Sequence, residues 1–176
     1  MQKIKPGSKM IFLLLGILPQ VHLALITTIK GQDEKGLSTT EFAGSTMMEP
    51  IEFELKHDQI IPDLLEKPVE HVLKVVYEDD TTVCFGNTLK AAAAQDVPEK
   101  ISWHCEYPQV KFHTIVFVDL DVLSRDNPVE REWQHWIIGN IPDDRIKAGQ
   151  TLTEYIGPTP VHGNGENSQR YLYLSH

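Results

Sequence analysis

The feature that most limits the fold of this chain is an apolar run at residues 112–118, FHTIVFV, which is followed directly by Asp119. A run that is rich in β-branched and aromatic residues and apolar on both faces predicts a central β-strand covered on both sides. A second run of the same character, Trp133–Ile141, ends at Pro142. The turn sequence SRDNP at 124–128 lies between them, so the pair predicts a mainly β fold.

Shorter segments of β-branched or alternating residues surround these two runs. Proline and glycine turns separate them, and the four alanines near residue 91 favour a short helix. We expect strands at 72–77, 81–85, 101–105, 152–156 and from 171–174, and short helices near 60–65 and 89–94. Ile51, Phe53 and Leu55 alternate at the entry to the first of these helices. The pattern predicts a single-domain β-sandwich or barrel-like fold with short peripheral helices.

Residues 1–24 have the pattern of a secretory signal, with three lysines before the apolar run 10–18 and Ala24 as a cleavage residue. The run is shorter than the ~20 apolar residues that span a bilayer, so an uncleaved anchor is the weaker alternative. Residues 25–48 lack periodicity and are expected to be a flexible linker, with the folded domain at 49–176. We therefore expect a secreted, extracellular protein without a transmembrane span after signal removal.

The charge of the chain limits its partners. It contains 16 basic and 25 acidic residues, for a net charge of −9, and removal of the signal would take away three more lysines. Such a domain lacks the basic surface that binds nucleic acid. An anionic ligand would have to be held by a local site and not by the overall field.

The two cysteines, Cys84 and Cys105, leave two alternatives open: one disulfide formed in an oxidising compartment, or two buried free thiols. Neither belongs to a C-x-x-C pair, and no H-E-x-x-H motif is present. We therefore expect no metal site, and no cofactor.

Two polar residues interrupt the central strands. Asp119 ends the first run, and His135 lies inside the second, where alternation puts it on one face and Trp136 on the other. A carboxylate beside an imidazole favours the protonated imidazole, so we expect a cationic His135, oriented by Asp119 and able to hold an anionic oxygen. Gln169 and Tyr171 share a face of the last strand and supply an amide and a hydroxyl.

Asp121, Ser124 and Arg125 are expected to be structural turn residues. Asp121 would accept backbone N–H groups of the turn at 124–127, and Arg125 would pair with one of the two aspartates. A hydrolase that used Ser124 with His135 and Asp119 would lack the G-x-S-x-G elbow of a nucleophilic serine. We therefore expect a protein that is not an enzyme.

From about Glu49 to Leu174, the order and spacing of several motifs resemble the phosphatidylethanolamine-binding protein family. The motifs are DLDVLSR at 119–125 followed by Asn127-Pro128, REWQHW at 131–136 with NIP at 140–142, YIGPTP at 155–160 and QRY at 169–171. The resemblance implies a β-sandwich with a small anion-accepting pocket near one end. The matching pocket positions are Asp119, Trp133, His135, Gln169 and Tyr171, with Pro158 and Pro160 on the rim.

The resemblance also implies a function. Members of the family bind phosphorylated or phospholipid headgroups, some inhibit kinases or serine proteases, and secreted insect members resemble odorant carriers. We expect a secreted binding protein for a small anionic or amphiphilic ligand, such as phosphoethanolamine, a phospholipid headgroup or an odorant-like molecule. The alternative is an extracellular serine protease inhibitor or signalling modulator that acts through surface loops such as 157–168.

The chain departs from the family pattern at several places. Gln169 stands where the family usually has histidine, so the pocket has one fewer group that can become cationic. Leu120 and Leu123 stand where the family usually has proline. The family also continues beyond Ser175 and His176 with a further helical and strand segment, so we expect a domain that is truncated at its C-terminus.

Overall fold

The two apolar runs form the adjacent central strands β7 (Phe112–Asp119) and β8 (Trp133–Pro142). The computed structural model describes residues 22–30, 48–69, 71–84, 86–103, 111–122, 124–159 and 169–175, and gives the backbone alone for 22–30, 48–50 and 71. The other strands are β1 (His22–Lys30), β2 (His71–Val72), β3 (Lys74–Val76), β4 (Thr82–Val83), β5 (Asn87–Lys90), β6 (Lys100–Ser102), β9 (Gln150–Thr153) and β10 (Gln169–Ser175). The helices are α2 (Met48–His57), α3 (Ile60–Asp63) and the short 3-10 turns η1 (Glu78–Asp80), η2 (Ala91–Ala94) and η3 (Ile146–Ala148).

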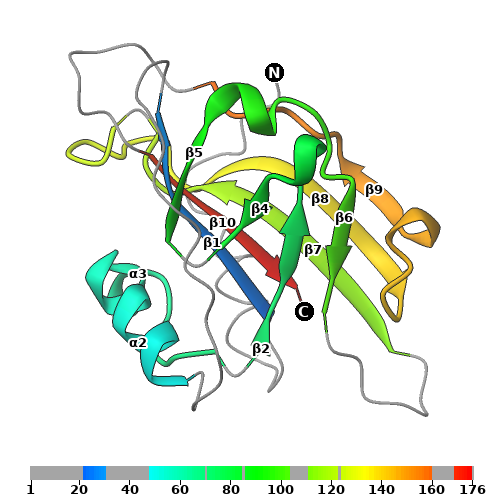
Figure 1. Cartoon of the computed structure of the whole chain (residues 1–176), viewed down its shortest axis with the longest axis horizontal. Coiled ribbons are helices and arrows are strands. Elements are labelled where there is room, and N and C mark those ends of the chain that lie inside the picture. The colour runs from blue at the N-terminus through cyan, green and yellow to red at the C-terminus, as the bar shows by residue number, and fades with distance from the viewer. Residues whose placement is uncertain are drawn as a thin grey trace.

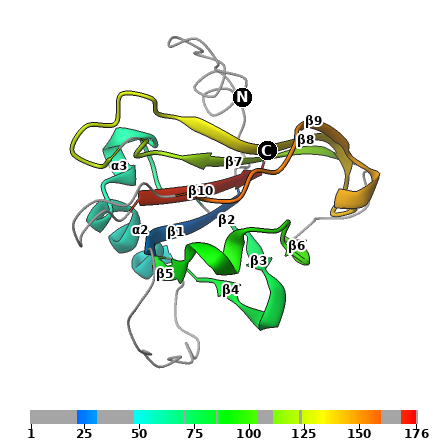
Figure 2. The same ribbon diagram turned by 90° about the horizontal axis from the view of Figure 1, so that it is seen from above.

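The strands form two sheets (Figure 1). The large sheet has the order β2-β1-β10-β7-β8-β9, and β5 also pairs with β1. The small sheet has the order β4-β3-β6. Figure 2 shows the small sheet lying against one side of the large sheet. This arrangement confirms the predicted mainly β fold with short helices.

The large sheet separates two apolar cores, because alternate side chains of β7 and β10 point to opposite faces. Ile115 and Phe117 of β7, with Tyr171 and Tyr173 of β10, pack against the small sheet. The intervening residues pack instead with α2 and α3; they are Val116, Val118, Leu172 and Leu174. Both faces of β7 are therefore covered, as its apolar sequence predicts.

Three tyrosine hydroxyls connect the small sheet with the large one. The Tyr77 hydroxyl lies 2.6 Å from that of Tyr173 and 3.1 Å from that of Tyr155. The Tyr155 hydroxyl donates to the Ala94 carbonyl at 2.7 Å. Because each hydroxyl has one proton, the hydrogen bonds run from Tyr173 through Tyr77 to Tyr155, and each of the three hydroxyls has a partner.

Several predicted boundaries differ from the structure. Ile51 and Leu55 are buried and Phe53 is exposed, because this segment belongs to the helix α2, where residues four apart share a face. The helix predicted over 89–94 is confined to Ala91–Ala94, since Leu89 and Lys90 belong to β5. Two strands begin earlier than predicted: β9 starts at Gln150 and β10 at Gln169.

The expected linker over 25–48 is wrong at its start. Residues 25–30 form the second part of β1, which pairs antiparallel with β10 and parallel with β2 and β5. The folded domain therefore includes residues before 49. The segment reads LITTIK, and its backbone pairing with β10 makes it a strand although it lies between the expected signal and residues without periodicity. Met48, the last residue of the expected linker, begins α2, and residues 31–47 lie outside the described residues.

The expected signal, 1–24, overlaps β1 by the three residues 22–24, and these pair with residues 173–175. Cleavage after Ala24 would remove these three residues from the sheet. The rest of the expected signal lies outside the described residues. Among the residues that are described, no helix is long and apolar enough to cross a membrane.

Cys84 has a free thiol and is exposed. It therefore fits neither of the expected alternatives, since it is not bonded and not buried. Cys105 lies outside the described residues.

Candidate functional site

Asp119 is the last residue of β7, and it lies directly beside two of the other predicted site residues. Its register partners are Trp133 on β8 and Tyr171 on β10. The end of β7 and the starts of β8 and β10 therefore meet at one place in the large sheet (Figure 1). Antiparallel pairing on both sides of β7 thus brings together residues that are far apart in the sequence.

His135 occupies a β-bulge in β8. Phe117 pairs with Trp136, but the next residue, Val118, pairs with Gln134, so His135 is the extra residue of β8. The His135 ring contacts Phe117 and Tyr171, with ring centroids 5.3 and 5.4 Å apart. Simple alternation put His135 and Trp136 on opposite faces, and this prediction is wrong because a bulge redirects the side chain.

A backbone carbonyl orients the imidazole of His135. Nδ1–H donates a 2.6 Å hydrogen bond to the Ile156 carbonyl, and the Ile156 N–H donates to the His135 carbonyl at 2.9 Å. The hydrogen bond from Nδ1–H to the Ile156 carbonyl fixes the tautomer of His135 and leaves Nε2 as the acceptor of the neutral ring. Burial lowers the pKa of His135, which is 4% exposed. The expectation of a cationic His135 oriented by Asp119 is therefore wrong: Ile156 orients it and desolvation favours its neutral form.

Asp119 is a buried carboxyl with a strongly raised pKa. It is 2% exposed, and burial raises its pKa to about 7, although Oδ1 accepts a 2.7 Å hydrogen bond from the backbone N–H of Asp121. An aspartate in water titrates near 4. Near neutral pH this group is therefore divided between a neutral acid and an anion.

Gln169 and Tyr171 join Asp119 in one hydrogen-bonded chain. The Tyr171 hydroxyl donates to Gln169 Oε1 at 2.8 Å, and Gln169 Nε2 donates to the Asp121 carbonyl at 3.3 Å. The Tyr171 hydroxyl also lies within hydrogen-bonding reach of the Asp119 carboxyl. The Tyr171 hydroxyl has a single proton, which it donates to Gln169. The Tyr171 oxygen can therefore accept a hydrogen bond from a protonated Asp119.

Asp121 has a structural role, but its hydrogen-bond partners differ from the predicted turn residues and Arg125. It is fully buried, and both carboxylate oxygens accept hydrogen bonds from the Arg170 guanidinium, at 2.9 and 2.7 Å. The backbone N–H of Arg170 donates to the same carboxylate. Arg125 instead points to the Asp58 carbonyl, at 3.4 Å. Arg170 was missed because its partner lies 49 residues away in sequence, although it is the one basic residue in β10.

Ser124 belongs to the predicted turn. The Asn127 N–H donates to the Ser124 carbonyl at 3.1 Å and to its hydroxyl oxygen at 3.2 Å. These two hydrogen bonds close a turn at 124–127.

The segment after β9 is held against η2. Gln95 Nε2 donates to the Pro158 carbonyl at 2.7 Å, and Pro158 is buried. A Cβ at Gly157 would lie 2.7 Å from both Cα and O of Gln95, so only glycine fits this approach. These contacts position Ile156, and through it His135.

Trp133 is half-buried, and Pro160 lies outside the described residues.

This arrangement agrees with a comparison of the sequence with known families. The family model described as phosphatidylethanolamine-binding protein matches residues 79–174, more than half of the chain. The chain belongs to this family. The matched residues contain Asp119, His135, Gln169 and Tyr171, so the four central residues of the candidate site lie within the part of the chain that defines the phosphatidylethanolamine-binding protein family.

Individual relatives support the same assignment. A Drosophila melanogaster protein named "Putative odorant-binding protein A5" is 32% identical over 120 residues, which cover 68% of this chain. The chain spans about half (55%) of the length of that relative. The phosphatidylethanolamine-binding protein from Plasmodium vivax is 26% identical, with a TM-score of 0.58 over 69% of each chain.

A second similar structure is a carboxypeptidase Y inhibitor solved in complex with its cognate proteinase. It is 23% identical and has a TM-score of 0.63, over 73% of this chain and 72% of the inhibitor chain. At this identity the similarity concerns the fold alone.

Proposed function

We propose that this protein is a secreted binding protein that holds a small anionic or amphiphilic ligand around Asp119 and His135. The other proposed contacts are Trp133, Pro158, Pro160, Gln169 and Tyr171. The observation that carries the proposal is the buried pair of titratable groups at the shared end of β7, β8 and β10: an oriented, neutral imidazole and a carboxyl with a pKa of about 7. Buried titratable groups with shifted pKa values are typical of functional sites.

The chemistry of these groups favours particular ligands. His135 offers an acceptor at Nε2, which suits a hydroxyl, an ammonium or a protonated phosphate oxygen. With His135 neutral and glutamine at position 169, neither group supplies positive charge for a phosphate dianion. A singly charged or zwitterionic headgroup such as phosphoethanolamine, attached to an apolar group that reaches half-buried Trp133, is therefore the favoured class.

Calorimetry with phosphoethanolamine at pH 6 tests the proposal. We expect saturable binding by the unmodified protein and its loss in His135→Ala. The matched control is His57→Ala, which removes an exposed histidine on α2 and should leave the affinity unchanged. Circular dichroism would check that both variants fold. Equal affinity of His135→Ala and the unmodified protein would overturn the proposal.

Secretion is part of the proposal. Its support is the signal-like pattern of the first residues, together with the name of the odorant-binding relative. Expression in insect cells should place the protein in the medium, and intact mass would give the processed N-terminus. Retention of the whole protein inside the cells would contradict secretion without affecting ligand binding.

Inhibition of an extracellular serine protease is the competing proposal. Its support is the similar fold of the carboxypeptidase Y inhibitor. Under this alternative the loop that begins at Gly157 would contact the protease. Ligand binding and protease inhibition can be separated with a panel of serine proteases. The proteases are assayed with the unmodified protein and with a variant that lacks residues 161–167. Loop-dependent inhibition together with unaltered activity of His135→Ala would favour inhibition over ligand carriage.

A further inference from the structure

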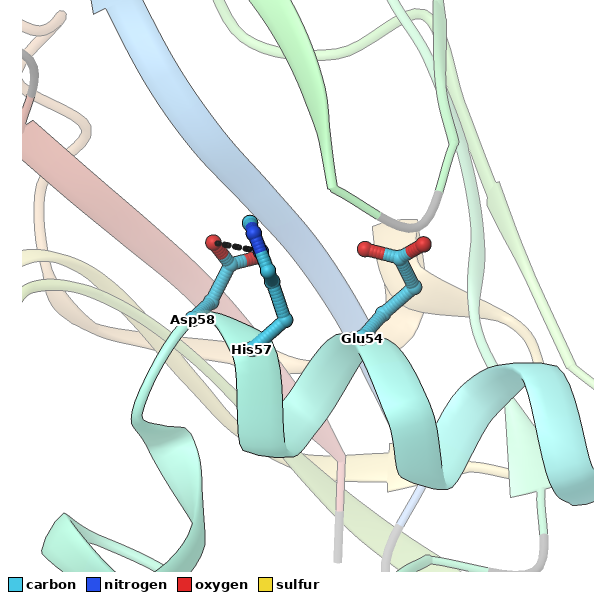
Figure 3. Close-up of side chains that lie close together, drawn as sticks. All are labelled: Glu54, His57 and Asp58. Carbon is cyan, nitrogen blue, oxygen red and sulfur yellow. Dashed lines mark ion pairs between the residues drawn. The ribbon is translucent and has the colours of Figure 1, made fainter.

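A second cluster of chemically active side chains lies away from the candidate site, at the C-terminal end of α2. One ligand atom from each of Glu54, His57 and Asp58 lies within 4.8 Å of the other two. Residues three and four positions apart share one side of a helix, and the Asp58 N–H still donates to the Glu54 carbonyl at 2.9 Å. Figure 3 shows all three side chains extending from the same side of α2.

The Asp58 carboxylate gives independent evidence that a bound ion or molecule belongs at this cluster. The residue is 6% exposed, and its Oδ2 has no hydrogen-bond partner among the residues that the structure describes. Its other oxygen, Oδ1, lies 3.4 Å from Nδ1 of His57. A buried carboxylate oxygen without a partner is costly, and such atoms in native proteins usually mark a bound ion, a water or a functional role. Burial accordingly raises the pKa of Asp58.

The donor set and the charge fit a divalent ion. Two carboxylates and one neutral imidazole carry a charge of −2, and this mixture of oxygen and nitrogen donors suits Zn²⁺, which accepts three protein ligands and one further ligand. The last turn of a helix also favours a cation, because its free carbonyls point outward.

The neighbouring positive charges are already engaged. Arg170 and Arg125 both act on Asp58 electrostatically. Arg170 makes its bidentate pair with Asp121, and Arg125 donates a hydrogen bond to the backbone carbonyl of Asp58. Lys56 pairs with Glu52 at 2.6 Å. These contacts leave the Asp58 carboxylate without a guanidinium partner of its own.

We infer that Glu54, His57 and Asp58 form a site for a divalent transition-metal ion, with Zn²⁺ as the best match. The sequence has no C-x-x-C pair and no H-E-x-x-H motif, so it predicts no metal site, and the pattern E-x-x-H-D at 54–58 is not one of these motifs. Asp58 also connects the end of α2 to the large sheet, because its backbone carbonyl accepts a 2.6 Å hydrogen bond from Arg170. This metal site is separate from the proposed ligand site around Asp119 and His135. Each of the two proposals can fail without affecting the other.

Titration of the chelator-treated full chain with ZnCl₂ tests this inference by calorimetry, and Co²⁺ absorption reports the coordination. We expect one saturable ion and a rise in melting temperature, since an ion that binds only the folded chain stabilises it. His57→Ala should weaken Zn²⁺ binding at least about tenfold, as should Glu54→Gln. The His57 side chain is 67% exposed, so its loss leaves the fold intact.

Glu52→Gln is the matched control, because it removes one carboxylate from the same helix outside the cluster and should change Zn²⁺ affinity less than about twofold. Asp58→Asn should abolish binding while circular dichroism shows a folded protein. The absence of saturable binding by the unmodified chain would overturn the inference, as would undiminished binding by His57→Ala.

Discussion

Asp121 and Arg170 form a buried bidentate ion pair next to Asp119 of the candidate site. Arg170 Nε lies 2.9 Å from Asp121 Oδ2, Nη2 lies 2.7 Å from Oδ1, and the two residues are 3% and 0% exposed. The Asp121 N–H in turn donates to Asp119. The pair therefore holds the backbone that orients the candidate carboxyl.

We predict that Arg170→Met destabilises the protein by about 3–5 kcal/mol, because it leaves the Asp121 charge buried without a partner. Urea denaturation measures the loss. The double variant with Asp121→Asn should recover a large part of it, since the unpaired charge is then absent. A single-variant loss below about 1 kcal/mol would show that the pair does not have this role.

The raised pKa of Asp119 predicts a specific pH dependence of stability. In the unfolded chain this carboxyl titrates near 4, and in the folded protein at about 7. The folded state therefore binds the proton more tightly, so this group's contribution to stability is complete below about pH 4 and is lost as the pH rises to about 7.

Asp119→Asn removes this titration while keeping an oxygen acceptor for the Asp121 N–H. We predict that the variant is more stable than the unmodified protein at pH 8, by on the order of 1–4 kcal/mol, and nearly equal to it at pH 4. Urea midpoints at the two pH values give the comparison. A constant difference at both would contradict the raised pKa.

Ligand binding should follow the same titration. Below pH 7 Asp119 is predominantly a neutral acid, and above pH 7 its negative charge repels an anionic headgroup. At an effective dielectric constant of 20, two like charges about 5 Å apart repel by ~3 kcal/mol. We predict that ionisation of Asp119 lowers phosphoethanolamine affinity by up to about tenfold between pH 6 and pH 8. In calorimetry Asp119→Asn should show a smaller fall than the unmodified protein, because only the second ionisation of the ligand phosphate then contributes. An affinity that rises with pH would exclude Asp119 as the titrating group.

Gly157 offers a test of the loop that orients His135. We predict that Gly157→Ala destabilises the protein by about 1–3 kcal/mol and weakens ligand binding, because the new Cβ would collide with the Gln95 backbone and displace Ile156. Gly139→Ala is the control, since the nearest atom to its Cβ would be in the flexible Leu152 side chain, at 3.1 Å, and Thr114 Oγ1 would lie at an ordinary contact distance of 3.8 Å. Thermal melting and calorimetry of both variants check this, and equal effects would count against the proposed role of the loop.

The parts of the fold that the sequence predicts are those with long apolar runs. Phe112–Val118 is apolar on both faces, and the structure places it as β7 between two cores. The place of Asp119 at the end of this strand follows from the same pattern. Residues 25–30, LITTIK, form only a short run of this kind beside the expected signal, and their place in β1 depends on pairing with β10.

The details of the candidate site depend on contacts that local sequence does not specify. The bulge at His135 arises from its register with β7, and alternation alone assigned the ring to the wrong face. Its orienting group is a backbone carbonyl, which any residue at position 156 would supply. The resemblance to phosphatidylethanolamine-binding proteins identified the candidate residues, but it did not predict a neutral histidine.

The central claim is that ligand contacts the neutral imidazole of His135. Nuclear magnetic resonance of protein labelled with ¹⁵N-histidine, titrated with phosphoethanolamine at pH 6, tests it most directly. The account predicts a His135 ring protonated at Nδ1 and a saturable shift of its Nε2 resonance, with no shift at exposed His57. A His135 resonance that stays unchanged at saturating ligand would contradict the account.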